Sequence, residues 1–407
     1  MNTALIFIPG IKGTKLYDSN TVDNEILWQD FRFNFEDFTR VEPSNPYNNN
    51  FFDEDFTTIT RPLHIEPLAY KEFWRKTDYR YKFIFPYDWR LPNKENGKRL
   101  KEFMQLILDK SQASENINDE DKITHFDFVT HSMGNMPLRF YILENGMALI
   151  NKIIFVCPPF KGSPEAITAL VVGQGMFFNR EDSRKLARTL PALLELLPTF
   201  DHYAIDSSDS SVVDLFKSEN WQANLLEQPK DEDVDKRTKK KFLKNLERAK
   251  NSLKELEDWN TKLTQEEKDR ILVLIRADVK TLLDVVVEKN PKTKNPKNYI
   301  DLRKSLHTAG GDGTVPNASS CHYCSEFTTY CFENRPFLID DYQHPFVLKD
   351  PRIQRVINGF LNSKENTKSY ELKIIGDTVF KVTSMKYVDV VDEQNQITHR
   401  VADLVKE

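Results

Sequence analysis

One serine of this sequence stands between a segment typical of a β-strand and a segment typical of a helix. Residues 123–129 are rich in β-branched and aromatic side chains, Ser132 follows, and residues 133–145 have helical character. A serine on such a sharp turn projects its hydroxyl above the end of a sheet, where it can attack a carbonyl carbon. Gly134 supplies the small residue this turn needs after the serine, although Thr130 stands before it where glycine is usual. The segment predicts that Ser132 is a nucleophile; an ordinary solvent-facing turn is the alternative.

A serine hydroxyl needs a base to take its proton, and on this type of turn the partners follow in the order acid, then histidine. Asp312 is the candidate acid, because the glycines around it let its loop turn the carboxylate toward an imidazole; a simple Asp-Gly turn is the alternative. His344 precedes an expected helix over residues 353–361 and is the candidate base. His322 is its rival, but it lies very close to the acid and before the last expected strand, which fits the chain order less well.

Acyl transfer also needs two N–H donors that bind the negative charge developing on the carbonyl oxygen. One is expected from the residue after the serine, Met133, and the other from a loop after an early strand. The segment Ile8–Thr14 supplies such a loop, and its Ile11 N–H is the candidate donor; a plain Pro-Gly turn is the alternative. His131 adjoins Ser132 in the sequence and must point away from it. We therefore expect His131 to contact the catalytic residues without taking part in the reaction.

The elements that would position these residues alternate between strand and helix. The pattern predicts strands over residues 4–8, 81–85, 123–129 and 150–157, with helices over 98–108 and 133–145 between them. Such alternation is typical of a mostly parallel sheet covered by helices on both faces, an α/β fold. Further strands are expected over 271–275, 284–288 and 327–332, and three short ones over 370–375, 378–383 and 386–391. The predicted organisation is a core in two parts (1–160 and 271–362), a helical cap or lid insertion (161–270) and a small C-terminal β extension (363–407).

Within the insertion, residues 228–270 are highly charged and predict a solvated helical hairpin. Val171–Phe178 carries two glycines between apolar residues and predicts either a mobile, apolar lid edge that touches a membrane surface or a core helix interrupted by a turn. Asp88 and Arg90 are expected to form a buried ion pair rather than to supply an alternative acid, because Asp88 precedes the serine.

Composition excludes some classes of function. A nucleic-acid partner would favour a basic stripe on the protein, and the formal net charge of −5 gives no support to such a partner. Four cysteines do not make a disulfide framework and indicate a reducing compartment. The Cys321–Cys324 pair, with His322 and Cys331, lacks the second pair of ligands that structural zinc needs, so free thiols are expected rather than a metal. The first apolar run is too short for a signal peptide or a membrane span, and we expect a cytoplasmic protein.

Taken in order, these motifs resemble the lecithin:cholesterol acyltransferase-like branch of the α/β-hydrolases, which includes lysosomal phospholipases and phospholipid:diacylglycerol acyltransferases. The resemblance covers about four-fifths of the chain and is carried by Ile8–Leu16, Pro86–Arg90, His131–Gly134, Pro159–Pro164, Leu190–Pro191, Leu196–Pro198, Gly311–Pro316 and His344. It implies an α/β-hydrolase fold, Ser132, Asp312 and His344 as triad, and Ile11 and Met133 as oxyanion donors.

The resemblance further implies acyl transfer from a lipid ester to water or to an alcohol, with no metal or organic cofactor and with transient contact to a membrane surface. The apolar stretch Leu190–Leu197 would line or cover the acyl pocket. Thr130 and Asn135 depart from the family pattern, and no cysteine precedes Cys157, so the disulfide-closed lid of secreted relatives is not expected. These departures bear on the substrate more than on the mechanism. Another esterase, thioesterase, amidase or deacylase on the same fold is the first alternative, and a non-catalytic scaffold that binds lipid or protein is the second.

Overall fold

The computed structural model describes residues 2–18, 26–28, 60–173, 180–222, 225, 232–289, 298–308, 310–333, 343–369, 379–391 and 397–406. The strand expected over 370–375 and most of the expected lid edge, residues 174–178, lie outside these ranges. Among the helices within them, none is long and apolar enough to cross a membrane.

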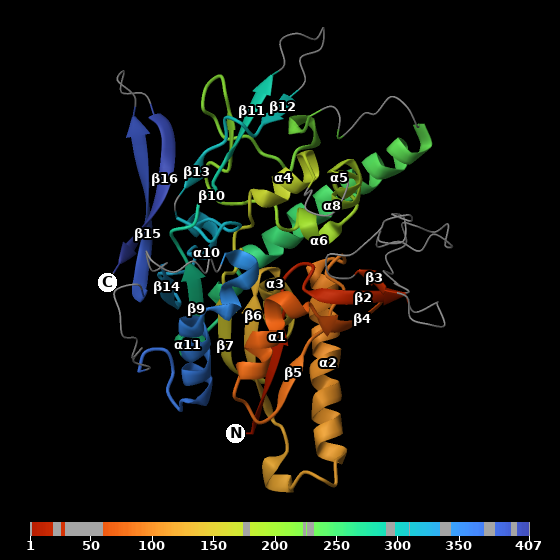
Figure 1. The fold of residues 1–407 in the computed structure, drawn as a ribbon, viewed down its shortest axis with the longest axis vertical. Helices are drawn as coiled ribbons and strands as arrows, with labels where there is room; N and C mark the ends of the chain where they lie inside the picture. The colour runs from red at the N-terminus through yellow and green to blue at the C-terminus, as the bar shows by residue number, and fades with distance from the viewer. Residues whose placement is uncertain are drawn as a thin grey trace.

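An eight-stranded sheet forms the centre of the molecule (Figure 1), in the order β16-β15-β14-β9-β7-β6-β1-β5. Six of these strands run parallel: β1 (Thr3–Ile8), β5 (Lys82–Ile84), β6 (His125–His131), β7 (Ile150–Val156), β9 (Ile271–Arg276) and β14 (Thr328–Phe332). The predicted mostly parallel α/β sheet is confirmed.

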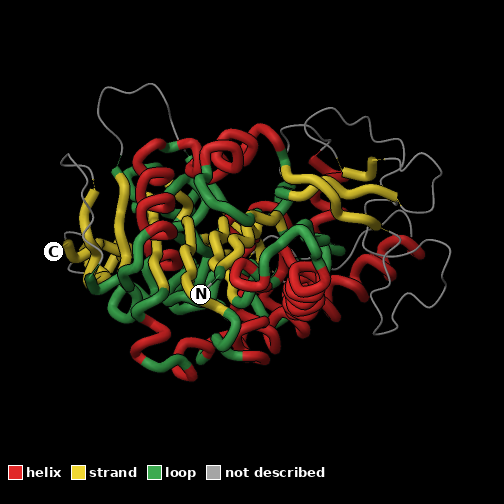
Figure 2. The backbone as a smooth tube through the Cα atoms, turned by 90° about the horizontal axis from the view of Figure 1, so that it is seen from below, coloured by secondary structure: helices red, strands yellow, loops and turns green. Residues whose placement is uncertain are grey.

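Helices cover both faces of this sheet (Figure 2). Along β1, Ala4, Ile6 and Ile8 contribute to one apolar core, whereas Leu5 and Phe7 contribute to the other. A strand buried on both faces reads as an uninterrupted apolar run, which is why this segment is recognisable in the sequence. The first core includes residues of α2 (Asn93–Ala113), α3 (Asn135–Asn145) and α8 (Glu232–Glu257); the second includes residues of α1 (Pro67–Lys76) and α11 (Pro351–Asn362).

The C-terminal strands belong to the main sheet. β15 (Val379–Val391) pairs antiparallel with β14, with Thr329 opposite Val382, and β16 (Ile397–Lys406) pairs antiparallel with β15. The expected extension therefore widens the sheet at its edge. The division of the chain into a two-part core, a cap and an extension stays a prediction.

The charged segment does not form the expected hairpin. It forms one helix of 26 residues, α8, followed by short turns. Phe242, Leu246 and Ala249 recur at helical spacing and are buried, because α8 lays this stripe against α6 (Pro191–Leu194) and α3. The density of charges on the opposite face concealed this stripe in the sequence.

Several small elements were not expected. β2 (Thr14–Asp18), β3 (Ile26–Trp28) and β4 (Thr60–Ile65) form an antiparallel sheet. β8 (Ala204–Asp206) and β12 (Asn298–Asp301) flank β11 (Val285–Lys289), the strand expected over 284–288, which pairs parallel with β8 and antiparallel with β12. β10 (Thr281–Leu282) pairs with β13 (His307–Thr308). Among the described residues, the other helices are α4 (Glu165–Val171), α5 (Arg180–Ala187), α9 (Gln265–Lys268), α10 (Asn317–Ser320) and the 3-10 turns η2 (Asp119–Asp121), η3 (Ser132–Gly134), η4 (Ser218–Asn220), η5 (Trp259–Lys262) and η6 (His344–Lys349).

The buried ion pair expected after β5 is present. The Arg90 guanidinium lies 2.6 Å from the Asp88 carboxylate, and both side chains are fully buried. Burial alone would raise the pKa of Asp88, but the Arg90 charge and hydrogen bonds outweigh burial and lower it. The residues on either side of Asp88 hold the Ile8–Thr14 segment: Tyr87 Oη donates to the Pro9 carbonyl at 2.9 Å and Trp89 Nε1 to the Thr14 carbonyl at 3.1 Å.

We predict that Asp88→Ala lowers the free energy of unfolding by about 3–5 kcal/mol, because it leaves the Arg90 charge buried without its carboxylate. Urea unfolding followed by tryptophan fluorescence measures this change. The control is Asp121→Ala, which removes the carboxylate of the exposed Arg80–Asp121 pair and should cost far less. Equal losses in the two variants would contradict the interpretation.

Candidate active site

The turn that carries Ser132 is built by a close approach of two backbones. Ser132 has a φ of 53°, a left-handed conformation that is uncommon for a residue with a side chain. A Cβ placed on Gly134 would lie 2.4 Å from the Ile8 carbonyl oxygen and 2.5 Å from that of Pro9. Only glycine fits there, and this contact sets the start of α3 against the end of β1. Thr130, whose position usually holds glycine, is fully buried within β6.

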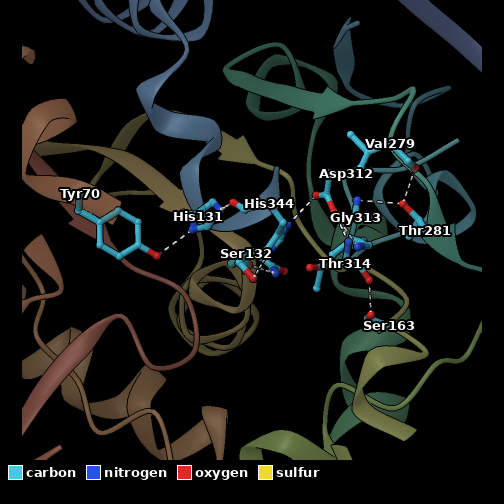
Figure 3. A network of polar contacts seen from close by, with 12 residues as sticks. Tyr70, His131, Ser132, Ser163, Val279, Thr281, Asp312, Gly313, Thr314 and His344 are labelled. Atoms are coloured by element: carbon cyan, nitrogen blue, oxygen red, sulfur yellow. Dashed lines mark hydrogen bonds and ion pairs between the residues drawn. The ribbon is translucent and has the colours of Figure 1, made fainter. Parts of the chain in front are cut away.

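The structure brings Ser132, His344 and Asp312 into one hydrogen-bonded line (Figure 3). The distance from His344 Nε2 to Ser132 Oγ is 2.7 Å, and that from His344 Nδ1 to Asp312 Oδ2 is 2.6 Å. A carboxylate only accepts, so the Nδ1 proton points at Asp312 and Nε2 is free to accept the serine proton. All three side chains are buried. These residues can therefore move a proton from the serine hydroxyl to the imidazole.

The acid is fixed by backbone donors. Asp312 Oδ1 accepts from the Thr314 N–H at 2.9 Å and from the Val315 N–H at 2.7 Å. Burial is the largest single influence on the pKa of Asp312 and would raise it, yet His344 and these two N–H groups together hold the pKa below its usual value. The carboxylate therefore stays ionised beside the imidazole.

The loop around the acid is tied to neighbouring segments. Gly313 has a φ of 91° and donates its N–H to Thr281 Oγ1 at 2.9 Å, while Thr281 Oγ1 donates to the Val279 carbonyl at 2.8 Å (Figure 3). Ser163 Oγ donates to the Thr314 carbonyl. The Pro159–Pro164 motif thus secures the Asp312 loop.

The two expected oxyanion donors lie on segments that border the serine. Met133 is fully buried and follows Ser132 directly. Ile11 sits in a tight turn that the Gly13 N–H closes onto the Gly10 carbonyl at 3.0 Å. A Cβ on Gly10 would lie 2.9 Å from the Ser132 Cβ, so this loop passes directly beside Ser132. Their role as oxyanion donors stays a prediction.

His131 points away from the serine side chain, as expected, and its ring is held at both nitrogens. Nδ1 lies 2.8 Å from the Tyr70 hydroxyl, and Nε2 lies 3.0 Å from the His344 carbonyl oxygen. Tyr70 comes from α1 and escaped the sequence analysis, because no motif marks a tyrosine on the apolar face of a helix.

Cys157 is a second residue that the sequence analysis did not place at the site. It follows β7 with a φ of 46°, its thiol is buried beside Asp312, and burial together with the Asp312 charge raises the pKa of that thiol. The signal available in the sequence was its place at the end of a parallel strand, where functional residues gather.

The rival groups lie elsewhere. His322 is exposed and its ring packs edge-on against Tyr323. Cys321, Cys324 and Cys331 are buried. Within the described ranges, the group of donor atoms close enough to hold a metal is that of Cys157, Asp312 and His344, and Asp312 and His344 already share a hydrogen bond.

Comparison with solved structures shows that the fold is shared. The structure of the Tle4–Tli4 complex aligns with 88% of this chain and 98% of that chain at a TM-score of 0.61 and 13% identity. Phospholipase PlaB from Legionella pneumophila in complex with thio-NAD aligns with 75% of this chain and 71% of that chain at 12% identity, but its TM-score of 0.22 is too low to bear on the fold. Among curated proteins, none matches the sequence.

The family comparison is more specific. The family model of lecithin:cholesterol acyltransferase matches residues 80–334, which is more than half of the 407 residues. The match includes the Asp88–Arg90 motif, the Ser132 turn and the Asp312 loop, and the fold and the arrangement of these segments agree with it. The chain belongs to the lecithin:cholesterol acyltransferase family of α/β-hydrolases.

Proposed function

We propose that this protein is a serine hydrolase or O-acyltransferase that acts on lipid esters through an acyl-enzyme. The observation that carries the proposal is the buried hydrogen-bonded line from Ser132 Oγ through the His344 ring to Asp312, with distances of 2.7 and 2.6 Å. An exposed serine beside a histidine is common, but a buried one whose base is itself oriented by a carboxylate matches the needs of nucleophilic catalysis.

In the proposed reaction, Ser132 Oγ attacks the ester carbonyl carbon while His344 Nε2 takes its proton. Asp312 holds the Nδ1 proton in place and stabilises the imidazolium that forms. The N–H groups of Ile11 and Met133 bind the oxyanion of the tetrahedral intermediate. His344 then gives the proton to the leaving alcohol, and an acyl-Ser132 remains.

The second half of the reaction reverses these steps with a new acceptor. Water or a lipid alcohol loses a proton to His344 as its oxygen attacks the acyl carbonyl, and Ser132 regains a proton when the acyl group leaves. The acceptor decides whether the reaction is hydrolysis or transacylation.

Membership in the family supports a lipid substrate. The apolar stretch Leu190–Leu197 offers a surface against which the acyl chain of that substrate could pack. This stretch lies against the motif that secures the acid loop: a Cβ on Gly162 would lie 2.3 Å from the Leu197 carbonyl oxygen, and the Ser163 N–H donates to the Leu196 carbonyl at 2.8 Å. Leu190, Leu194 and Leu197 are buried. We propose that an acyl chain enters beside this stretch when the enzyme contacts a membrane surface.

We predict that Asp312→Asn lowers kcat about 10⁴-fold on a short-chain p-nitrophenyl ester. The amide oxygen keeps the two backbone N–H bonds, so the amide N–H faces Nδ1 and forces the His344 proton onto Nε2, which can no longer accept from the serine. His344→Gln should be equally inactive, whereas the rival variant His322→Gln should retain the wild-type rate. Activity that is lost in His322→Gln and kept in His344→Gln would overturn the assignment of the base.

The substrate class is tested by fatty-acid release from mixed phospholipid and neutral-lipid vesicles, comparing the wild type with Ser132→Ala. We expect release by the wild type alone, and mass spectrometry of the products identifies the ester and any acyl acceptor. If the wild type releases no fatty acid but cleaves a p-nitrophenyl ester through Ser132, the lipid assignment is wrong and the triad assignment stands.

A further inference from the structure

The hydrogen bonds around His131 have proton positions that can be deduced. The His344 carbonyl oxygen can only accept, so His131 Nε2, at 3.0 Å, carries the proton. Nδ1 of the neutral ring then has only a lone pair, so the Tyr70 hydroxyl, at 2.8 Å, donates to it. The Tyr70 oxygen in turn accepts the Gly10 N–H at 3.1 Å. The result is one directed chain, from the Gly10 N–H through Tyr70 and His131 to the His344 carbonyl.

The surroundings keep every proton in this chain where the geometry places it. Burial, aided by the neighbouring His344, lowers the pKa of His131 to about 3, although Asp312 and the hydrogen bond to the His344 carbonyl act in the opposite direction. Burial raises the pKa of the Tyr70 hydroxyl well above its usual value. Over the range in which enzymes work, His131 is therefore neutral and Tyr70 keeps its proton, so neither group takes part in proton transfer.

The two ends of the chain lie on the two halves of the proposed machinery. Gly10 immediately precedes Ile11, the proposed oxyanion donor, and its loop passes beside Ser132. The His344 imidazole is the proposed base, and it packs against the ring of His131 with centroids 4.9 Å apart. Figure 3 shows Tyr70 and His131 on the opposite side of His344 from Asp312. Asp312 thus orients the His344 imidazole from one side, while the hydrogen-bonded chain of Tyr70 and His131 holds the His344 backbone from the other.

We propose that Tyr70 and His131 are positioning residues that set the oxyanion loop and the base relative to each other. The inference rests on the proposed function, because it assigns these residues to the same reaction at Ser132. An oxyanion donor acts only within a few tenths of an ångström of its proper distance, and a displacement of about 1 Å can cost 10²-fold in rate. Hydrogen bonds that join the loop of Ile11 to His344 are a direct way to keep the proposed oxyanion donor and the proposed base at a fixed distance from each other.

The first variant is Tyr70→Phe, which leaves the Gly10 N–H without its acceptor and His131 Nδ1 without its donor in a buried place. We expect kcat on a p-nitrophenyl ester to fall about 10- to 100-fold with KM little changed. The variant would displace the Ile11 N–H, which in the proposed reaction binds the oxyanion in the transition state and not the bound substrate. The rate constant for labelling of Ser132 by a fluorophosphonate should fall by a similar factor. Rates are normalised to the number of labelled sites, so partial unfolding does not mimic the effect.

The matched control is Tyr79→Phe. Its hydroxyl donates to Asp127 at 2.5 Å and contacts Thr3, at the far end of β1 from the site. The variant also removes one hydroxyl with two polar partners, so it should lower the thermal unfolding temperature comparably. Its normalised kcat should stay within about twofold of the wild type, since sites that share no partners act independently.

Two His131 variants complete the test. His131→Gln places an amide N–H where it can reach the His344 carbonyl and should retain much of the activity, whereas His131→Leu keeps no donor and should resemble Tyr70→Phe or be worse. Equal activity of the two His131 variants would overturn the positioning role of Tyr70 and His131, and so would an unchanged kcat and labelling rate in Tyr70→Phe. In either case, labelling of Ser132 in the wild type would leave the proposed function standing. A wild type that the fluorophosphonate does not label at Ser132 would overturn the proposed function itself.

Discussion

The contact between Gly134 and the end of β1 sets the geometry of the turn that carries Ser132. A side chain there would lie 2.4 Å from the Ile8 carbonyl oxygen, so α3 can begin this close to the sheet only from a glycine. The same closeness forces Ser132 into a left-handed conformation and brings the Gly10–Gly13 turn beside it. The strain of that conformation persists because parallel strands on both sides of β6 hold its end in place.

The residues of the candidate site could be selected from the sequence because they lie in short segments with a fixed order. Ser132, Asp312 and His344 follow one another as the fold requires, and the structure joins them. Tyr70 could not be found in this way, since its hydroxyl meets His131 only through the packing of α1 on the sheet. The face of α8 was misjudged because its apolar stripe is narrow among many charges, and the pairing of β15 with β14 is a long-range register that no local pattern specifies.

A buried arginine explains how α8 is anchored to α3. Arg139, on α3, donates to the Leu256 carbonyl at the end of α8 at 3.1 Å, and its guanidinium lies 5.2 Å from the Trp259 ring centre and 5.5 Å from that of Phe160. A guanidinium tolerates this setting better than an ammonium, because it is weakly hydrated and stacks on aromatic rings. The helix that follows Ser132 is therefore also the helix to which the end of α8 is fastened.

The distribution of the triad along the chain has a consequence for biosynthesis. Ser132 precedes His344 by 212 residues, and a ribosome adds about 5–20 residues per second. A nascent chain thus contains Ser132 for about 10–40 s before His344 is added. During that interval the Ser132 hydroxyl lacks the imidazole that it bonds in the folded protein, so the proposed chemistry waits for the last part of the chain.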